Sequence, residues 1–333
     1  MEKTGSWSRN GPGREIRDKM TSMNVHNFAL GLASLGRPGY INLGHGQDLG
    51  DIDYASMQER CLTVLDAAYD AGIRHIDAAR SYGSAEDFLA LWMEKRRPAD
   101  LFISSKWGYR YTADWKTDAK DHEIKDHSLS HLQSQWLESH ERLGSHLNLY
   151  QIHSATLKTG VLDDAGVMNF LGGLKNRGMQ IGLSLSGTEQ SATLEKAFEI
   201  RMDGVQLFNS VQATCNVLES SVVPALKVAH ESGWLVIVKE ALANGRLTHR
   251  GDCNDFLDFA RKREVSPDAL ALAYMLANPF VSRVLLGPTT IQQLESNLGA
   301  LQVRLSQNEM EALSAMREEP ADYWKKRSAL EWN

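Results

Sequence analysis

Three strand-like runs of the sequence are each followed by side chains that can take part in acid–base chemistry. Asp77 and Tyr82 follow the first run, Lys106 follows the second and His153 follows the third. A free phenol, with a pKa of about 10, is a poor acid or base near neutrality, but a neighbouring lysine lowers that pKa. An aspartate paired with the lysine keeps the ammonium charged, and a neutral imidazole orients a substrate oxygen. Together the four types predict an acid–base group directed at a carbonyl or an alcohol.

Each of these residues alone carries little information. Asp77 can cap the next helix, Lys106 can be a solvated charge, and His153 can be a core histidine with satisfied hydrogen bonds. Four such residues at consecutive strand ends are much less expected by chance. We therefore treat them as one candidate site.

Short β-type runs alternate with amphipathic helical patterns along the chain, without a break in composition. The expected strands are 28–32, 74–76, 101–105, 147–152, 180–184, 210–214, 235–239 and 283–286. The expected helices are 56–71, 84–95, 127–142, 166–177, 190–201, 218–232, 255–263, 267–277 and 291–300. This alternation predicts one parallel α/β unit, and the number of strands favours a closed (β/α)8 TIM barrel over an open doubly wound sheet. In such a barrel the polar residues at the strand ends meet on one rim.

The barrel is expected to occupy residues 25–333 as one domain. Residues 1–24 are rich in Gly, Ser, Arg and Lys without periodicity, which predicts a flexible tail. Gly72, Gly178 and Gly233 each follow a helical run, at the position where a left-handed helix cap is expected.

The overall composition excludes several classes of partner. The 36 Lys and Arg against 42 Asp and Glu give a net charge of −6, so there is no basic field for nucleic acid or anionic lipid. The apolar run at 234–238 is far shorter than the roughly 20 residues that cross a bilayer, and the polar start of the chain is unlike a secretory signal. Three isolated cysteines (Cys61, Cys215 and Cys253) read as reduced thiols. We expect a cytoplasmic protein that binds a small molecule; its oligomeric state is not determined by the sequence.

Several stretches, running in order from about residue 28 to residue 301, resemble the aldo-keto reductase family. They are GIRHIDAARSYGSAE (72–86), LFISSKWG (101–108), LNLYQIHS (147–154) and IGLS (181–184), followed by the weaker SVQATCNVLE (210–219), VIVKEALANGRLT (236–248) and LLGPTTIQQLESNL (285–298).

The resemblance implies a barrel that uses a nicotinamide cofactor, without a metal ion, to interconvert a carbonyl compound (an aldehyde, ketone or aldose) and an alcohol. Tyr82 would then be the proton donor, Lys106 and Asp77 would tune it, and His153 would orient the substrate oxygen.

The resemblance also implies positions for the cofactor. Ser184 and Gln212 match the residues that hold the nicotinamide carboxamide, and Leu242 and Gly245 lie in the matching pyrophosphate loop. The positions that match the adenosine end are Gly287, Pro288, Thr289, Gln293 and Asn297.

The chain departs from the family pattern in ways that bear on the cofactor. Lys239 stands where reductases of the family usually place an aromatic ring against the nicotinamide, and Glu240 replaces a usual serine. Thr289 stands where a basic residue commonly binds the 2′-phosphate of NADP, a group that favours Arg or Lys. Lys239, Arg246 or a loop residue would have to compensate. We expect NADP as the cofactor, with NAD as the alternative.

Two aromatic segments are candidates for the substrate pocket. The loop after Lys106 contains Trp107, Tyr109, Tyr111 and Trp115, which either wall the pocket or pack the loop onto the rim. The segment 322–332 near the C-terminus either covers the pocket or packs on a helix.

Two other functions remain open at this stage: a cofactor-binding regulatory protein with little turnover, and a barrel lyase or isomerase that needs no nicotinamide. His122, His127 and His131 lie close together, but without a third ligand at a plausible spacing they indicate a surface helix and not a metal site.

Overall fold

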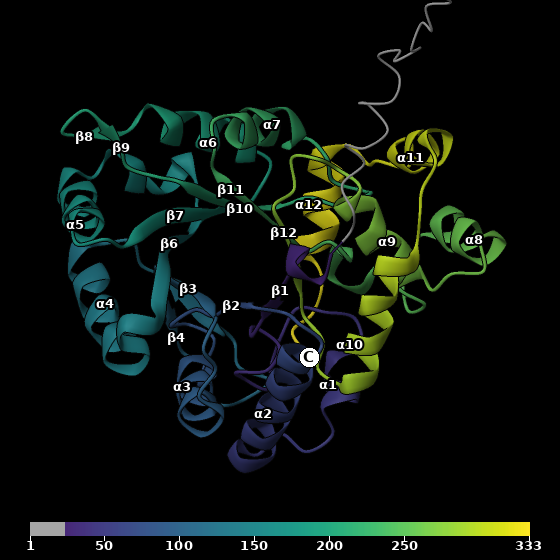
Figure 1. Cartoon of the computed structure of the whole chain (residues 1–333), viewed down its shortest axis with the longest axis horizontal. Coiled ribbons are helices and arrows are strands. Elements are labelled where there is room, and N and C mark those ends of the chain that lie inside the picture. The colour runs from purple at the N-terminus through teal and green to yellow at the C-terminus, as the bar shows by residue number, and fades with distance from the viewer. Residues whose placement is uncertain (1–23) are drawn as a thin grey trace, which may run out of the picture.

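Eight parallel strands close into a barrel in the computed structural model, which describes residues 24–333 (Figure 1). Their order around the barrel is β1, β12, β11, β10, β7, β6, β3 and β2. Their bounds are β1 Phe28–Gly31, β2 His75–Asp77, β3 Phe102–Trp107, β6 Leu147–Ala155, β7 Gln180–Leu185, β10 Ser210–Thr214, β11 Leu235–Lys239 and β12 Arg283–Leu286. Each coincides with an expected strand to within three residues, and the predicted (β/α)8 TIM barrel is confirmed.

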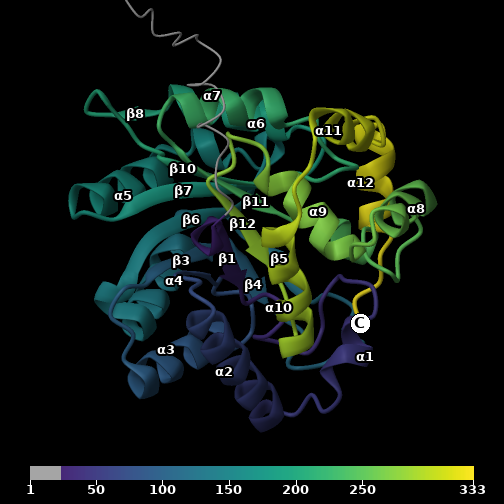
Figure 2. The same cartoon turned by 45° about the vertical axis from the view of Figure 1, so that its right-hand side comes forward.

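The nine expected helices are also present, and those from α2 to α7 surround the strands (Figure 1). They are α2 Tyr54–Asp70, α3 Ala85–Arg96, α4 Leu129–Leu143, α5 Ala165–Asn176, α6 Gln190–Glu199, α7 Val223–Glu231, α8 Asn254–Lys262, α9 Pro267–Leu276 and α10 Ile291–Leu298. The described chain also contains α1 His45–Leu49, α11 Gln307–Ser314 and α12 Pro320–Ser328. In both views α8, α11 and α12 gather on one side of the barrel (Figure 2).

Apolar strands and glycine caps explain why the sequence folds in this way. Parallel strands that face a packed interior on one side and helices on the other are nearly continuous apolar runs, and every residue of β10 is buried. Gly72, Gly178 and Gly233 have φ angles of +100°, +92° and +81°, which confirms the left-handed turns that lead from helix to strand.

Two short antiparallel hairpins interrupt the alternation of strands and helices. One pairs β4 Tyr109–Tyr111 with β5 Glu123–Lys125, directly after β3. The other pairs β8 Arg201–Met202 with β9 Val205–Gln206. The first hairpin matters for function because it brings Glu123 to the rim of the barrel.

The two ends of the described chain differ in what they contact. The flexible tail expected for residues 1–24 lies outside the described residues except for Asn24, whose side chain caps the 3-10 helix Val25–Asn27. At the other end Asn333 exchanges backbone hydrogen bonds with Tyr40, so the residues after α12 return to the rim.

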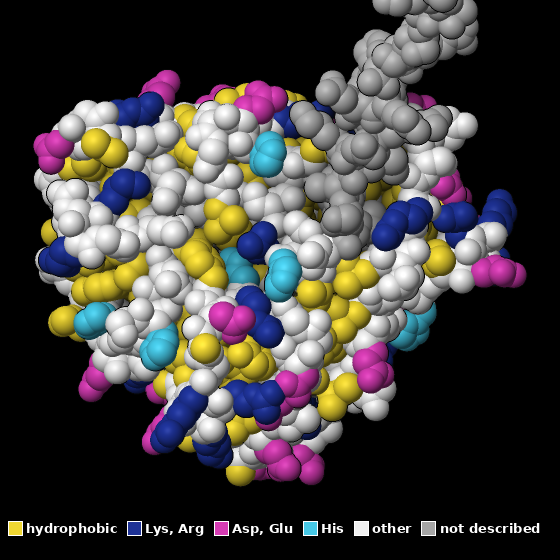
Figure 3. All heavy atoms as spheres, in the orientation of Figure 1, with side chains coloured by type: hydrophobic (Ala, Val, Ile, Leu, Met, Phe, Trp, Pro, Cys, Tyr) yellow, Lys and Arg dark blue, Asp and Glu magenta, His cyan; other side chains and the backbone are white. Residues whose placement is uncertain are grey.

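The surface of the barrel carries charges of both signs. Figure 3 shows acidic and basic side chains interspersed over one face. Within residues 24–333 no helix is both long and apolar enough to cross a membrane.

Candidate active site

Three neighbouring strands deliver the four predicted residues to one rim. Asp77 ends β2, Tyr82 lies in the loop that follows, Lys106 is near the end of β3, and His153 is near the end of β6. In the barrel β3 lies between β2 and β6. The side chains of successive strand ends are therefore brought together as the sequence predicts.

A buried ion pair lies at the base of this site. Lys106 Nζ contacts Asp77 Oδ2, and the side chains are 0% and 3% exposed. Lys106 Nζ also donates to the carbonyl oxygen of Ala78 at 2.9 Å. The other oxygen of Asp77 accepts hydrogen bonds from Ser104 Oγ at 2.6 Å and from Gln212 Nε2 at 3.2 Å. Each charge thus has its partners, which a buried pair requires.

Tyr82 and His153 stand above this pair. The Tyr82 hydroxyl lies 3.4 Å from His153 Nε2, and the two rings are nearly perpendicular. Lys106 Nζ is 4.9 Å from the centroid of the Tyr82 ring. The second imidazole nitrogen of His153 lies 3.4 Å from Ser81 Oγ, which helps to fix the ring plane.

The pKa of Tyr82 departs from the sequence-based expectation. Burial raises this pKa well above its usual value, and the carboxylates of Asp77 and Glu123 raise it further, whereas Arg37 opposes them. Asp77, the ion-pair partner of Lys106, itself raises the pKa of Tyr82, so the net lowering expected from the sequence is not found. The phenol is thus held in its protonated form, as a proton donor requires.

The pKa of His153 shifts in the opposite direction. Burial lowers it well below its usual value, and the positive charges of Lys106 and Lys239 contribute to the lowering. The imidazole is therefore neutral near physiological pH, as expected. A neutral imidazole next to a protonated phenol can hydrogen-bond a carbonyl oxygen without adding a charge to the site.

One cavity of about 220 Å³ joins these residues to the positions expected for the cofactor. Asp77, Tyr82 and His153 line one part of it. The expected cofactor residues that line it are Gln212, Lys239, Leu242, Gly287 and Asn297.

The lining of this cavity fits a dinucleotide. Asn244 lines the cavity, and its Oδ1 atom is buried without a hydrogen-bond partner among the described residues, as an acceptor that awaits a donor is. A Cβ atom at Gly287 would meet only Ser34 Oγ, at 3.9 Å, which leaves open space beside the backbone. A backbone without a side chain at this point lets an extended ligand approach closely.

Several of the expected cofactor residues, Ser184 and Arg246 among them, are engaged by hydrogen bonds or ion pairs within the protein. Ser184 Oγ accepts a hydrogen bond from the backbone N–H of Ser154 at 2.8 Å. The guanidinium of Arg246 is paired with Glu318 at 2.7 Å and with Asp252 at 3.1 Å. Arg246 therefore stabilises the packing of the loop, and its guanidinium is not available to replace the basic residue that Thr289 lacks.

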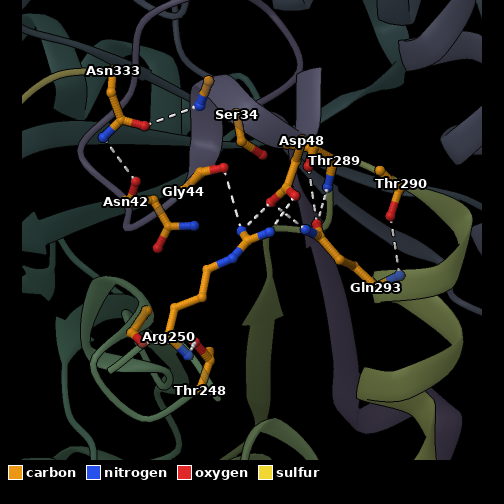
Figure 4. Close-up of polar contacts among 12 residues, drawn as sticks. Ser34, Asn42, Gly44, Asp48, Thr248, Arg250, Thr289, Thr290, Gln293 and Asn333 are labelled. Atoms are coloured by element: carbon orange, nitrogen blue, oxygen red, sulfur yellow. Dashed lines mark hydrogen bonds and ion pairs between the residues drawn. The ribbon is translucent and has the colours of Figure 1, made fainter. Parts of the chain in front are cut away.

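The region around Thr289 and Gln293 holds a polar cluster that the sequence did not reveal. Gln293 Oε1 accepts from the backbone N–H of Thr289 at 2.8 Å, and its Nε2 donates to Asp48 Oδ2 at 2.7 Å. Asp48 in turn binds both terminal nitrogens of Arg250, at 2.5 and 2.6 Å. Figure 4 shows Arg250 extending from the loop before α8 toward Asp48 and Gln293. We call Asp48, Arg250 and Gln293 the latch cluster, because it joins three segments far apart in sequence.

Of the four aromatic residues considered for the substrate pocket, only Tyr109 lines the cavity. Trp107 is fully buried, Trp115 Nε1 donates to the carbonyl oxygen of Ile52 at 2.6 Å, and the Tyr111 hydroxyl accepts from the Trp115 backbone N–H. For these three residues the structure supports the alternative that they pack the loop onto the barrel.

Six more residues line the cavity that the sequence analysis did not name as site residues. They are Arg37, Tyr40, Glu123, Glu240, Arg327 and Trp332. Arg327 and Trp332 belong to the aromatic and basic segment 322–332, for which a covering role was one of two expectations. Glu240 lies in the stretch 236–248 and was noted there only as a departure from the family pattern, whereas no motif marks Arg37, Tyr40 or Glu123. Arg37 and Tyr40 come from the irregular loop after β1, and Glu123 comes from the β4–β5 hairpin.

Arg37 connects three of these segments. Its Nη1 donates to the carbonyl oxygen of Ser81 at 2.9 Å and pairs with Glu123 at 2.8 Å. Its guanidinium carbon lies 4.9 Å from the centroid of the Trp332 ring. The loop that carries Tyr82 is thereby tied to the hairpin and to the C-terminal segment.

Fold and site define a barrel protein in which a tyrosine, a histidine and the aspartate of a buried ion pair line one cavity at the rim. The chain belongs to the aldo/keto reductase family, whose model matches residues 39–318. Membership implies a nicotinamide-dependent reduction of carbonyl compounds.

Individual relatives are distant. The chain is 25% identical to the aldo-keto reductase str7 of Strobilurus tenacellus, over 92% of each chain. It is 24% identical to an aryl-alcohol dehydrogenase [NADP(+)] of Phanerodontia chrysosporium, over 88% of this chain and 82% of the relative. The holo form of an aldo-keto reductase from Bacillus halodurans shares the fold, with a TM-score of 0.65 and 21% identity over 88% of this chain and 92% of that one.

Proposed function

We propose that the protein reduces an aldehyde or ketone to an alcohol with NADPH, and catalyses the reverse oxidation, with Tyr82 as the general acid and base. The observation that carries this proposal is the position of the Tyr82 hydroxyl. It lies 3.4 Å from a neutral His153, in the same cavity as Gln212, Leu242 and Gly287.

The reduced nicotinamide supplies the hydride when it is bound. His153 orients the carbonyl oxygen, and the protonated phenol of Tyr82 delivers a proton to that oxygen as negative charge develops on it. The Asp77–Lys106 pair holds an ammonium 4.9 Å from the Tyr82 ring, which stabilises the phenolate left after transfer. Burial of the site excludes water from the reacting groups.

The cofactor would lie along the cavity, held at one end by Gln212 with Ser184, along its length by Leu242 and Gly245, and at the other end by the segment from Gly287 to Asn297. The unpaired Oδ1 of Asn244 supplies an acceptor between the two ends.

Arg250 is the loop residue that we propose as the partner of the 2′-phosphate of NADP. It is joined through Asp48 to Gln293, at the adenosine end, where Thr289 provides no positive charge. A guanidinium that already binds a carboxylate through two N–H groups has the geometry to bind a phosphate instead. The Phanerodontia relative is named as an NADP(+) enzyme, which is consistent with this choice.

Reduction of a simple aromatic aldehyde, followed by the loss of NADPH absorbance, tests the proposal directly. We expect turnover that falls by about 10²- to 10⁴-fold in Tyr82→Phe, because the general acid is lost. NADPH binding, followed by tryptophan fluorescence, is expected to be nearly the same in both proteins.

Two other outcomes would point to the alternatives. Tight binding of NADPH by the wild-type protein without turnover of any carbonyl would favour a regulatory protein. Absence of binding to both NADPH and NADH in a folded sample would favour a barrel enzyme that needs no nicotinamide.

A further inference from the structure

Three charged side chains beside the proposed catalytic site carry a net positive charge. Glu240 follows β11 and binds Arg327 of α12 through both oxygens, with distances of 2.7 and 3.3 Å. Lys239, the last residue of β11, has its Nζ 3.6 Å from Glu240 Oε1 and donates a shorter bond to the neutral hydroxyl of Thr214, at 2.7 Å. We call Lys239, Glu240 and Arg327 the Glu240 group. It contains two cations and one anion.

The other charges at the cavity are balanced one to one. Asp77 is paired with Lys106, and Glu123 is paired with Arg37. Among the described residues that line the cavity, no carboxylate besides those of Asp77, Glu123 and Glu240 is present. The Glu240 group therefore leaves one positive charge at the cavity wall without a counter-charge.

Lys239 is the member of the group best placed to meet a ligand. Glu240 is bound more closely by Arg327 than by Lys239. The Lys239 side chain retains 16% of its exposure and lines the cavity together with His153 and Tyr82. The positive charge of Lys239 also contributes to the lowered pKa of His153.

A charge in such a place is costly unless an anion joins it. Removing an ammonium from water carries a penalty that an opposite charge in the same low-dielectric site offsets. The remaining wall suits the body of a planar molecule, because Tyr40, Tyr109 and Trp332 line the same cavity.

We propose that the carbonyl substrates of this protein carry a carboxylate, and that Lys239 binds this carboxylate while the carbonyl oxygen lies at Tyr82 and His153. The proposal rests on the carbonyl reductase activity proposed above. It adds a substrate class, planar aldehydes or ketones with one negative charge, and a residue that selects it.

The cofactor is the other possible source of an anion, because its pyrophosphate is expected near Leu242, three residues after Lys239. The two sources predict different results. A pyrophosphate contact affects cofactor affinity and all carbonyl substrates alike, whereas a substrate carboxylate affects only substrates that have one.

The test compares para-formylbenzoate with its neutral methyl ester. For each protein the kcat/KM ratio of acid to ester is measured with NADPH, so that a general change in activity cancels. We expect the wild-type protein to favour the acid by about tenfold, the size of one charge-assisted hydrogen bond. In Lys239→Gln the ratio is expected to fall to about one, and Lys239→Arg is expected to keep most of the preference.

Two further variants make the test independent of folding effects at Lys239. Lys125→Gln removes a positive charge from the nearby hairpin, where Lys125 Nζ binds the carbonyl oxygen of Ser154, and it is expected to leave the ratio unchanged. Glu240→Gln removes the anion of the group and also lowers the pKa of Lys239, so its acid-to-ester ratio is measured at a pH well below 8, where Lys239 stays charged and the ratio is expected to rise. Circular dichroism checks that each variant is folded.

Binding of both aldehydes, measured by calorimetry on the wild-type protein and Lys239→Gln in the presence of oxidised cofactor, separates this inference from the proposed function. Tighter binding of the acid that is lost in Lys239→Gln supports the inference even if neither aldehyde is turned over, a result that would overturn only the reductase proposal. Equal binding of acid and ester overturns the inference. So does a weaker affinity of Lys239→Gln for NADPH with an unchanged ratio, which would assign the charge to the pyrophosphate.

Discussion

Two ion pairs on which the proposed function depends are built in different ways. At the proposed catalytic end of the rim cavity the Asp77–Lys106 pair has side chains that are 3% and 0% exposed, and both residues lie on barrel strands. The Asp48–Arg250 pair, which contacts Gln293 at the proposed adenosine end, is 14% and 30% exposed, and it connects a short helix to a loop. One ion pair is part of the core, whereas the other lies at the surface.

This difference determines what each pair can do. A buried pair is stable only while both partners and their hydrogen bonds are complete, so its geometry is fixed before the substrate arrives. A partly exposed pair contributes little to stability, and its cation can exchange one anion for another at little cost. The fixed pair therefore suits catalysis, and the exchangeable pair suits recognition of a cofactor.

The largest expected effect comes from breaking the buried pair. In Lys106→Met the carboxylate of Asp77 loses its counter-charge in the core, so the free energy of unfolding should fall by about 3 kcal/mol. Turnover should fall by about 10²-fold or more, because the ammonium near the Tyr82 ring is removed. Urea unfolding and aldehyde reduction measure the two effects separately.

The double variant Asp77→Asn/Lys106→Met is the control for this prediction. It removes both charges, so much of the lost stability should return while activity stays low. A stability of Lys106→Met equal to that of the wild-type protein would contradict the claim that the pair is buried and dependent on both partners. Full activity of the double variant would contradict the role of the charges in catalysis.

A smaller effect is expected at the latch cluster. Arg250→Gln should weaken NADPH binding by about tenfold, as expected for the loss of one charge-assisted contact, with little change for NADH. Asp48→Asn frees Arg250 and should leave NADPH binding as tight as in the wild-type protein or tighter. Both variants should change the free energy of unfolding by about 1 kcal/mol or less, because the pair is partly exposed. Fluorescence titration with both cofactors measures the affinities.

A preference for NAD over NADP would give the latch cluster a different role. If Asp48→Asn weakens NADH binding and Arg250→Gln leaves NADPH binding unchanged, Asp48 recognises a ribose hydroxyl and the protein prefers NAD. Equal affinities in all three proteins would mean that the latch cluster only joins the loops.

The sequence predicts the catalytic end well because its geometry follows from strand periodicity. Strand ends of a parallel barrel share one rim, so the positions of Asp77, Lys106 and His153 follow once the strands are located. The raised pKa of Tyr82 could not be predicted from strand periodicity. Its direction depends on how deeply the phenol is buried and on Glu123, which reaches the site from a hairpin that the periodicity did not indicate.

The adenosine end and the substrate pocket could not be predicted in the same way. Asp48, Arg250 and Gln293 are far apart in the sequence, and each stands in a loop or a helix where its residue type is common. Their contact depends on the paths of irregular loops, for which no local pattern exists. The aromatic loop after Lys106 shows the same limit, because only Tyr109 of its four candidates lines the cavity.

The smallest predicted effect concerns the dependence of the acid-to-ester ratio on pH. It contrasts a charge that titrates, on Lys239, with one that does not, on the arginine of Lys239→Arg. Burial lowers the pKa of Lys239 to about 8, with Glu240 raising it and Arg327 and Lys106 lowering it. Lys239 is therefore charged below that pH and neutral above it, whereas the carboxylate of para-formylbenzoate is ionised throughout. Because kcat/KM reports the groups of the free protein, the acid-to-ester ratio should decline severalfold as the pH rises through about 8. In Lys239→Arg, whose guanidinium stays charged, the ratio should be flat over the same range. A decline of equal size in Lys239→Arg would show that another group controls the preference.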